Sequence, residues 1–214
     1  MIRILKFEFN PIEVNTYVVF DETLQCVIID AGCSNGYENE ILQNAIAEHN
    51  LVPQKLICTH GHFDHIMGND FVCKTYNINT FMHENDLENV INATSYSAYF
   101  SVDIVQPPVP CDFLSDGDEI RFGNSALKVI FTAGHTRGGI CLYSETEKIL
   151  FSGDTLFKGS IGRTDLPGGD YDVLVESLQK LMRLPDDTKV YCGHGEETTI
   201  GYEKETNPFV MEIM

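Results

Sequence analysis

The pattern of apolar and polar residues predicts strands and helices along nearly the whole chain. Residues 2–9 alternate apolar and polar side chains, as a half-buried strand does, whereas Tyr37, Ile41 and Ala45 recur at helical spacing. By these criteria we expect strands at 2–9, 14–20, 26–29, 55–58, 80–82, 119–122, 126–132, 140–143, 148–152 and 189–192. Helices are expected at about 37–50, 64–76, 84–91, 170–184 and 199–206.

The order of these elements favours a layered α/β fold. Helices and strands alternate in blocks, and no linker composition or clear repeat divides the 214 residues, so we predict one domain spanning 1–214. The least regular segment is 94–110, where prolines at 107, 108 and 110 exclude the interior of a helix. This segment is either a substrate lid or, as we favour, a packed surface loop.

Composition narrows the class of partner and compartment. The formal net charge of −18 lacks the basic footprint that nucleic acids or anionic membranes require. Seven cysteines, an odd number without a Cys-x-x-Cys pair, suggest free buried thiols in a reducing compartment. Charges interrupt the apolar residues near the N-terminus, and no uninterrupted apolar stretch approaches about eighteen residues. We therefore expect a cytoplasmic protein that acts on a small molecule.

Candidate chemistry is concentrated in the run Thr59-His60-Gly61-His62-Phe63-Asp64-His65. Imidazole and carboxylate are the usual ligands of hydrolytic Zn, Fe and Mn sites. His60 and His62 are two residues apart, so both can point to one side of an extended segment, and Asp64 and His65 can then serve a second, neighbouring ion. The run follows a predicted strand, where ligands are commonly held on loops above a rigid sheet.

Three later loops repeat this arrangement. His135, Asp154 and His194 each stand beside a glycine at the end of an apolar strand. Asp30 also ends a strand. Each is a weak signal alone, but together with the first cluster they form one pattern.

These residues resemble the metallo-β-lactamase superfamily, whose defining run is Thr-His-x-His-x-Asp-His, and matches extend from Asp30 to Pro208. The resemblance implies an αββα four-layer sandwich. It also implies that His60, His62 and His135 hold one metal ion, that Asp64, His65 and His194 hold a second, and that Asp154 bridges the two. Asp30 is expected to orient a ligand. We expect two divalent ions, zinc first and iron or manganese as alternatives.

Two such ions, about 3.5–4 Å apart, hold a bridging hydroxide near neutral pH. We expect this hydroxide to attack a carbonyl carbon, with Asp64 as the catalytic group that shuttles a proton. Cys58 is interpreted as a core residue.

Further residues and sequence segments indicate which branch of the superfamily the chain resembles. His62 differs from the glutamate of flavodiiron reductases, and Asp154 differs from the true β-lactamases, which usually lack a bridging aspartate. Residues 153–165 and 193–201 are similar to glyoxalase II-like enzymes, which hydrolyse thioesters. Lys158 and Arg163 are therefore predicted to bind an anionic acyl thioester. The added C-terminal helical region of glyoxalase II does not follow His194, so the thiol carrier stays open.

Other functions stay open beside this one. Persulfide dioxygenases are similar in sequence and use a single iron at positions matching His60, His135 and Asp154. A lactone makes demands like those of a thioester, so a lactone hydrolase is a further alternative. A non-catalytic metal-binding module is the least favoured because the ligand set is intact. The oligomeric state is not predicted.

Overall fold

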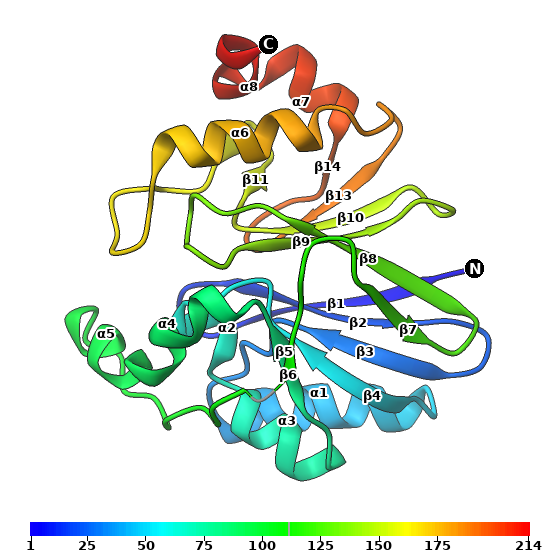
Figure 1. The fold of residues 1–214 in the computed structure, drawn as a ribbon. Helices are drawn as coiled ribbons and strands as arrows, with labels where there is room; N and C mark the ends of the chain where they lie inside the picture. The colour runs from blue at the N-terminus through cyan, green and yellow to red at the C-terminus, as the bar shows by residue number, and fades with distance from the viewer. Residues whose placement is uncertain (111) are drawn as a thin grey trace.

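The computed structural model describes residues 1–110 and 112–214, and its strands form two six-stranded sheets that face each other (Figure 1). The first sheet contains, in spatial order, β1 (Arg3–Phe9), β2 (Val14–Phe20), β3 (Gln25–Ile29), β4 (Val52–Ile57), β5 (Thr80–Met82) and β6 (Asp112–Phe113). The second contains β14 (Thr198–Thr199), β13 (Lys189–Cys192), β10 (Ile149–Gly153), β9 (Ile140–Ser144), β8 (Ser125–Phe131) and β7 (Glu119–Phe122). A short hairpin, β11 (Leu156–Phe157) with β12 (Ser160–Ile161), follows β10.

Strand direction decides where the ends of these strands meet. In the first sheet β3, β4, β5 and β6 are parallel neighbours. In the second sheet β8 and β10 are both antiparallel to β9, and β10 is parallel to β13, so β8, β10 and β13 run in the same direction. The carboxyl ends of these three strands therefore lie at one edge of the second sheet.

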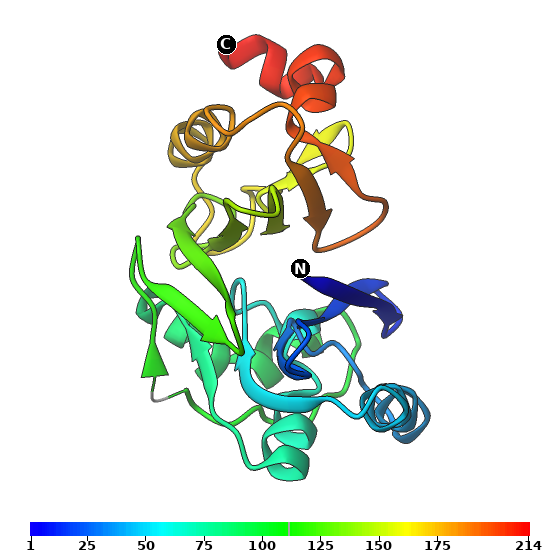
Figure 2. The same ribbon diagram turned by 90° about the vertical axis from the view of Figure 1, so that its right-hand side faces the viewer.

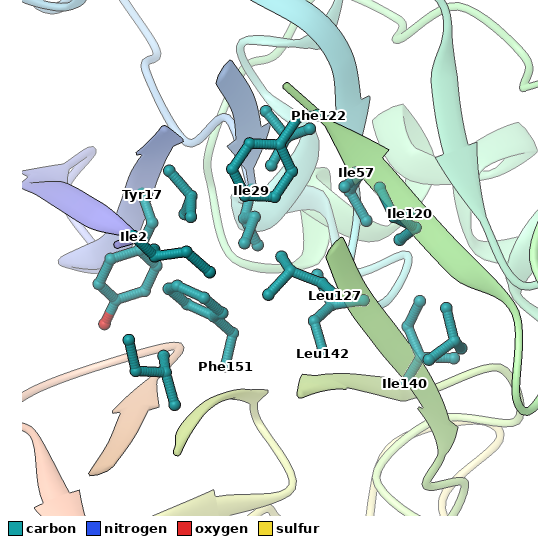
Figure 3. Packing of buried hydrophobic residues seen from close by; sticks show 14 of the residues in the cluster. Ile2, Tyr17, Ile29, Ile57, Ile120, Phe122, Leu127, Ile140, Leu142 and Phe151 are labelled. Atoms are coloured by element: carbon teal, nitrogen blue, oxygen red, sulfur yellow. The ribbon is translucent and has the colours of Figure 1, made fainter. Parts of the chain in front are cut away.

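The main core lies between the two sheets (Figure 3). Tyr17, Ile29 and Ile57 from the first sheet pack against Leu142 and Phe151 from the second. Since helices cover the outer faces, the central strands are buried on both sides. This explains why β2, β3 and β10 are almost continuously apolar, whereas the edge strand β1 alternates.

Helices form the two outer layers (Figure 2). On the first sheet, α1 (Gly36–Glu48) contributes Leu42 and Ile46, and α3 (Asn69–Tyr76) contributes Val72. On the second sheet lie α6 (Tyr171–Leu181), α7 (Ile200–Thr206) and α8 (Pro208–Ile213). The predicted αββα sandwich is thus confirmed.

Several details of the prediction were wrong. The single helix expected at 64–76 is two, α2 (Phe63–Ile66) and α3, because the Gly68 N–H donates to Ala31 O, 2.7 Å away, and not to a carbonyl of the preceding turn. The 84–91 segment begins as a 3₁₀ turn, η1 (Glu84–Asp86), before α4 (Leu87–Ile91). The segment 94–110 begins as a helix, α5 (Ala93–Tyr99), whose sequence shows little apolar periodicity.

Two sequence-based expectations concern cysteines and membranes. Six cysteines are free thiols and five of them are buried, as expected, while Cys111 lies outside the described residues. The described helices are all too short or too polar to span a bilayer.

Candidate metal centre

The predicted ligands converge at one edge of the sandwich. Asp30 follows β3 and His60 follows β4 in the first sheet, whereas the loops after β8, β10 and β13 carry His135, Asp154 and His194 in the second. A bridge between Val14 and His194 joins the two sheets at this edge. Ligand-type side chains that are far apart in sequence are therefore brought together by the ends of parallel strands.

The nitrogen atoms form two close groups. His60 Nε2 lies 3.2 Å from His62 Nδ1, and His65 Nε2 lies 3.2 Å from His194 Nε2. Nitrogens bound to one zinc ion in tetrahedral geometry lie about 3.3 Å apart, given Zn–N bonds of about 2.0–2.1 Å. These separations suit pairs of ligands that share an ion. His135 completes the group of His60 and His62, whose ligand atoms lie within 4.8 Å of one another.

Asp154 occupies the centre of the cluster. Its Oδ1 lies 3.3 Å from His65 Nε2, and its Oδ2 lies 3.5 Å from His135 Nε2 and 3.6 Å from His194 Nε2. His60 Nε2 is 4.0 Å from the same Oδ2. Asp154 thus faces both groups of histidines.

Asp64 belongs to the second group. Its Oδ2 lies 3.3 Å from His194 Nε2 and 3.6 Å from His65 Nε2. All seven predicted ligands are therefore within one cluster.

Hydrogen bonds on the far side of the rings fix their tautomers. Carbonyl oxygens accept the Nδ1 protons of His135 (Arg163 O, 2.7 Å) and His194 (Ile12 O, 3.1 Å). With Nδ1 protonated, the Nε2 lone pair of each of these histidines faces the cluster.

Asp30 fixes two further rings, those of His65 and His60. Its Oδ2 accepts the Nδ1 proton of His65 at 3.0 Å and the hydroxyl proton of Thr59 at 2.7 Å. The Thr59 oxygen can then accept the Nδ1 proton of His60, 3.1 Å away. The position of Asp30 therefore matches the orienting role predicted for it.

Sequence analysis missed Asp86, which is fully buried and links two ligand loops. Its Oδ2 accepts the Gly61 N–H at 2.8 Å and the Thr136 hydroxyl at 2.7 Å, and its Oδ1 accepts the Gly138 N–H at 2.6 Å. Gly61 lies between His60 and His62, and Thr136 follows His135. Its carboxylate therefore joins the loops that carry one group of ligands. The burial of Asp86 and the 3₁₀ turn that ends at it are visible in the structure and have no signal in the local sequence.

Burial and neighbouring charges shift the pKa values of the cluster in different directions. Burial lowers the pKa of His62 to about 4 and holds that of His60 well below its ordinary value. Burial raises the pKa of Asp154, but the neighbouring imidazoles, His65 foremost, lower it well below the ordinary value. Burial alone would lower the pKa of His65 and of His194, but the carboxylates of Asp154 and Asp64 raise both values. Protons are therefore shared between these imidazoles and carboxylates, and a metal ion that binds here displaces them, because its ligands must be deprotonated.

Two buried polar atoms test whether the residues fit a metal ion. His135 Nε2 and Asp154 Oδ1 are inaccessible to solvent and have no hydrogen-bond partner. Buried polar atoms without a partner are rare and point to a role, such as coordination of an ion. The donor set, the nitrogen separations and these atoms together fit divalent metal ions.

The predicted substrate contacts have different positions. Arg163 borders the cavity of about 640 Å³ above the cluster, and its guanidinium makes hydrogen bonds of 2.7 Å and 2.6 Å to Asp165. Lys158 forms an ion pair with Glu196 and is not among the residues that line this cavity.

Comparison with known proteins agrees with this fold and cluster. The family model of the metallo-beta-lactamase superfamily matches residues 10–194. The chain therefore belongs to the metallo-beta-lactamase superfamily, and its His/Asp cluster is the candidate metal centre of a metal-dependent hydrolase. A curated relative, "Hydroxyacylglutathione hydrolase GloC" of Haemophilus influenzae, is 33% identical over 92% of this chain and 92% of its own length.

Two solved structures are similar over nearly their whole length. The crystal structure titled "BLEG-1 B3 metallo-beta-lactamase" is 34% identical, with a TM-score of 0.89 over 98% of this chain and 99% of that one. The structure of TTHA1623 "in a di-iron-bound form" is also 34% identical, with a TM-score of 0.88 over 96% and 99%. The family supports use of a divalent metal, while these names leave the identity of the metal open.

Proposed function

We propose that the protein hydrolyses acyl thioesters with two divalent metal ions. The arrangement of the cluster carries this proposal: the Asp154 carboxylate lies within 4.0 Å of histidines from both proposed ligand sets, His60 and His135 in one and His65 and His194 in the other. In the proposed assignment His60, His62 and His135 would hold one ion, Asp64, His65 and His194 would hold the other, and Asp154 would serve both.

The roles of the protein's own groups follow from their positions. When bound, the two ions would supply a deprotonated water near neutral pH and positive charge for the carbonyl oxygen. Burial raises the pKa of Asp64, but the contacts with His65 and His194 lower it by a larger amount, so its carboxylate is ionised. In this proposal the Asp64 carboxylate is the group that shuttles a proton. Asp30 and Asp86 hold the ligand loops in place.

A thioester is favoured over other carbonyl substrates by sequence similarity. The runs 153–165 and 193–201 resemble glyoxalase II-like enzymes, and GloC, named a hydroxyacylglutathione hydrolase, is a relative over nearly the whole chain. The true β-lactamases usually have no bridging aspartate at the position of Asp154, which argues against a β-lactam substrate. One of the similar solved structures, BLEG-1, nevertheless carries the name of a β-lactamase. A β-lactam therefore belongs in the test as a competing substrate.

Zinc is the metal we propose first, because histidine-rich sites of this kind suit it. Iron and manganese suit the same ligands, and the di-iron form of TTHA1623 makes iron the first alternative.

The proposal is tested by a substrate panel. Protein purified without chelator is assayed with an acyl thioester of butanethiol, a lactone, a β-lactam and glutathione persulfide. We expect hydrolysis of the thioester to be fastest, to stop on metal removal and to return when metal is restored. In the variant His60→Ala, kcat/KM should fall by more than about 100-fold, since the loss of one ligand weakens binding of the metal ion.

The matched control is His49→Ala, because His49 caps the end of α1 away from the cluster. It should keep wild-type activity. Oxygen consumption with the persulfide and no thioester hydrolysis would replace the proposal with persulfide oxidation. Preference for the lactone or the β-lactam would replace it with that hydrolysis, and wild-type activity in His60→Ala would refute the role of this cluster.

A further inference from the structure

The cavity above the cluster has a polar floor and mainly apolar walls. Its floor contains His62, Asp64, His135, Asp154 and His194. At about 640 Å³ its volume lies within the range of about 300–1,000 Å³ typical of small-molecule sites. A substrate whose carbonyl lies against the floor therefore has room for a further group, and the walls determine what that group is.

The walls are mainly apolar. Ile12, Phe63, Leu166 and Pro167 line the cavity, together with an aromatic cluster at the end of α5 that consists of Tyr96, Tyr99 and Phe100. This set is drawn from four separate segments of the chain.

The aromatic cluster is unusually exposed. Tyr99 is 86% exposed and Phe100 is 48% exposed, although the Phe100 ring also packs on Phe63 with ring centroids 5.5 Å apart. Large apolar groups that are gathered at a cavity and remain open to water mark a surface that a ligand can cover. Covering these rings would release free energy in proportion to the apolar area removed from water.

Positively charged side chains are scarce in the walls of the same cavity. Arg163 is the one lysine or arginine among the described residues that line it, and Asp165 already accepts two hydrogen bonds from its guanidinium. The nearby Lys158 is paired with Glu196. An anionic group on the substrate would therefore have to compete with carboxylates of the protein for both cations.

We infer that the substrate carries an uncharged, apolar aryl or alkyl group, which packs on Tyr99 and Phe100 while its carbonyl faces the ligand cluster. This inference rests on the proposed thioester hydrolysis and narrows it. It differs from the sequence-based prediction that Lys158 and Arg163 bind an anionic substrate.

The test uses two substrates that differ by one carboxylate group: S-butyl phenylthioacetate and its 4-carboxy derivative. We expect kcat/KM of the metal-loaded protein to be about tenfold or more higher for the neutral thioester, because the carboxylate loses solvation without gaining a free cation. Tyr99→Ala should raise KM for the neutral substrate about tenfold and change kcat less than about twofold, because the lost contact is made equally in the ground state. Tyr37→Ala, which removes another exposed tyrosine from a helix, is the matched control and should change neither.

A binding measurement separates this inference from the proposed function. The amides N-butylphenylacetamide and its 4-carboxy derivative are titrated calorimetrically into metal-loaded wild type and Tyr99→Ala. Tighter binding of the neutral amide, weakened by Tyr99→Ala, supports the inference even if no thioester is hydrolysed, in which case the proposed function alone fails. Preference for the carboxylated compounds that disappears in Arg163→Ala would overturn the inference while leaving thioester hydrolysis intact.

Discussion

Replacement of Asp86 by asparagine tests whether the ligand loops depend on one buried carboxylate. The side chain accepts hydrogen bonds from Gly61, Thr136 and Gly138, which belong to the two loops around His60 and His135. Asparagine keeps the volume of aspartate but offers one acceptor oxygen instead of two. If that oxygen takes the place of Oδ2, the bonds from Gly61 and Thr136 remain, and the amide NH₂ then points at the Gly138 N–H.

The expected magnitude follows from this count of donors and acceptors. One buried donor is left facing another donor, which costs about 1–3 kcal/mol. Asp86→Ala leaves three donors without an acceptor and should cost about 3 kcal/mol or more. For a chain of this length, each 1 kcal/mol lowers the melting temperature by about 2–4 °C. Groups that orient metal ligands typically change metal affinity by about 10–100-fold, so we expect Asp86→Asn to weaken metal binding by about tenfold or more.

The assay combines thermal unfolding of metal-free protein with a competition titration against a chelating dye. The matched control is Glu203→Gln, since Glu203 is also fully buried and accepts hydrogen bonds from Gly159, Thr198 and Asn207. None of these three partners lies in the loops that carry His60, His62 and His135. Glu203→Gln should therefore lower the melting temperature by a similar amount and leave metal affinity nearly unchanged.

Two results would refute this reasoning. Wild-type melting temperature and metal affinity in Asp86→Asn would mean that the carboxylate does not hold the loops. Equal loss of metal affinity in Asp86→Asn and Glu203→Gln would mean that the loss reflects general destabilisation and not the position of the ligand loops.

Two further predictions concern acid stability and the approach of the backbone to the cluster. Burial alone would raise the pKa of Asp21, but hydrogen bonds from its own turn and the 124–125 turn lower it to about 2, so its contribution to stability is complete above pH 4 and is lost as the pH falls through 2. Urea unfolding should show Asp21→Asn to be less stable by about 2 kcal/mol at pH 7, with a deficit that shrinks between pH 4 and 2; a deficit independent of pH would contradict the assignment. An added Cβ at Gly193 would lie 2.1 Å from Asp154 Oδ1, so Gly193→Ala should weaken metal binding about tenfold or more in a dye titration. The control Gly36→Ala should leave metal binding unchanged, because a Cβ at Gly36 meets nothing within 4 Å. Equal metal affinities of the two variants would contradict this prediction and show that Asp154 can move.

The sequence predicted the sandwich and the cluster because their signals are local. Each predicted ligand loop follows a strand whose apolar residues are readable in a short window, and glycine beside His135, Asp154 and His194 marks a tight loop. The strands β2, β3 and β10 were recognisable because burial on both faces demands continuous apolar runs.

Features that depend on distant partners were not predictable. Asp86 contacts residues that are 25, 50 and 52 positions away, so no window of sequence reveals its role. The helix α5 escaped detection because its buried side, Ala93 and Ser97, is small and weakly apolar. The sequence predicted a substrate contact for Arg163 but could not show that its guanidinium is hydrogen-bonded to Asp165.

Metal content per chain tests the central claim most directly. The protein is purified without chelator, and Zn, Fe and Mn are measured by elemental mass spectrometry against protein concentration, for wild type, His60→Ala and the control His49→Ala. We predict about two ions per chain in wild type and His49→Ala, and a lower content in His60→Ala. A single iron per chain in wild type, unchanged when His62, His65 or His194 is replaced, would contradict the two-metal hydrolase and favour a mononuclear oxygenase.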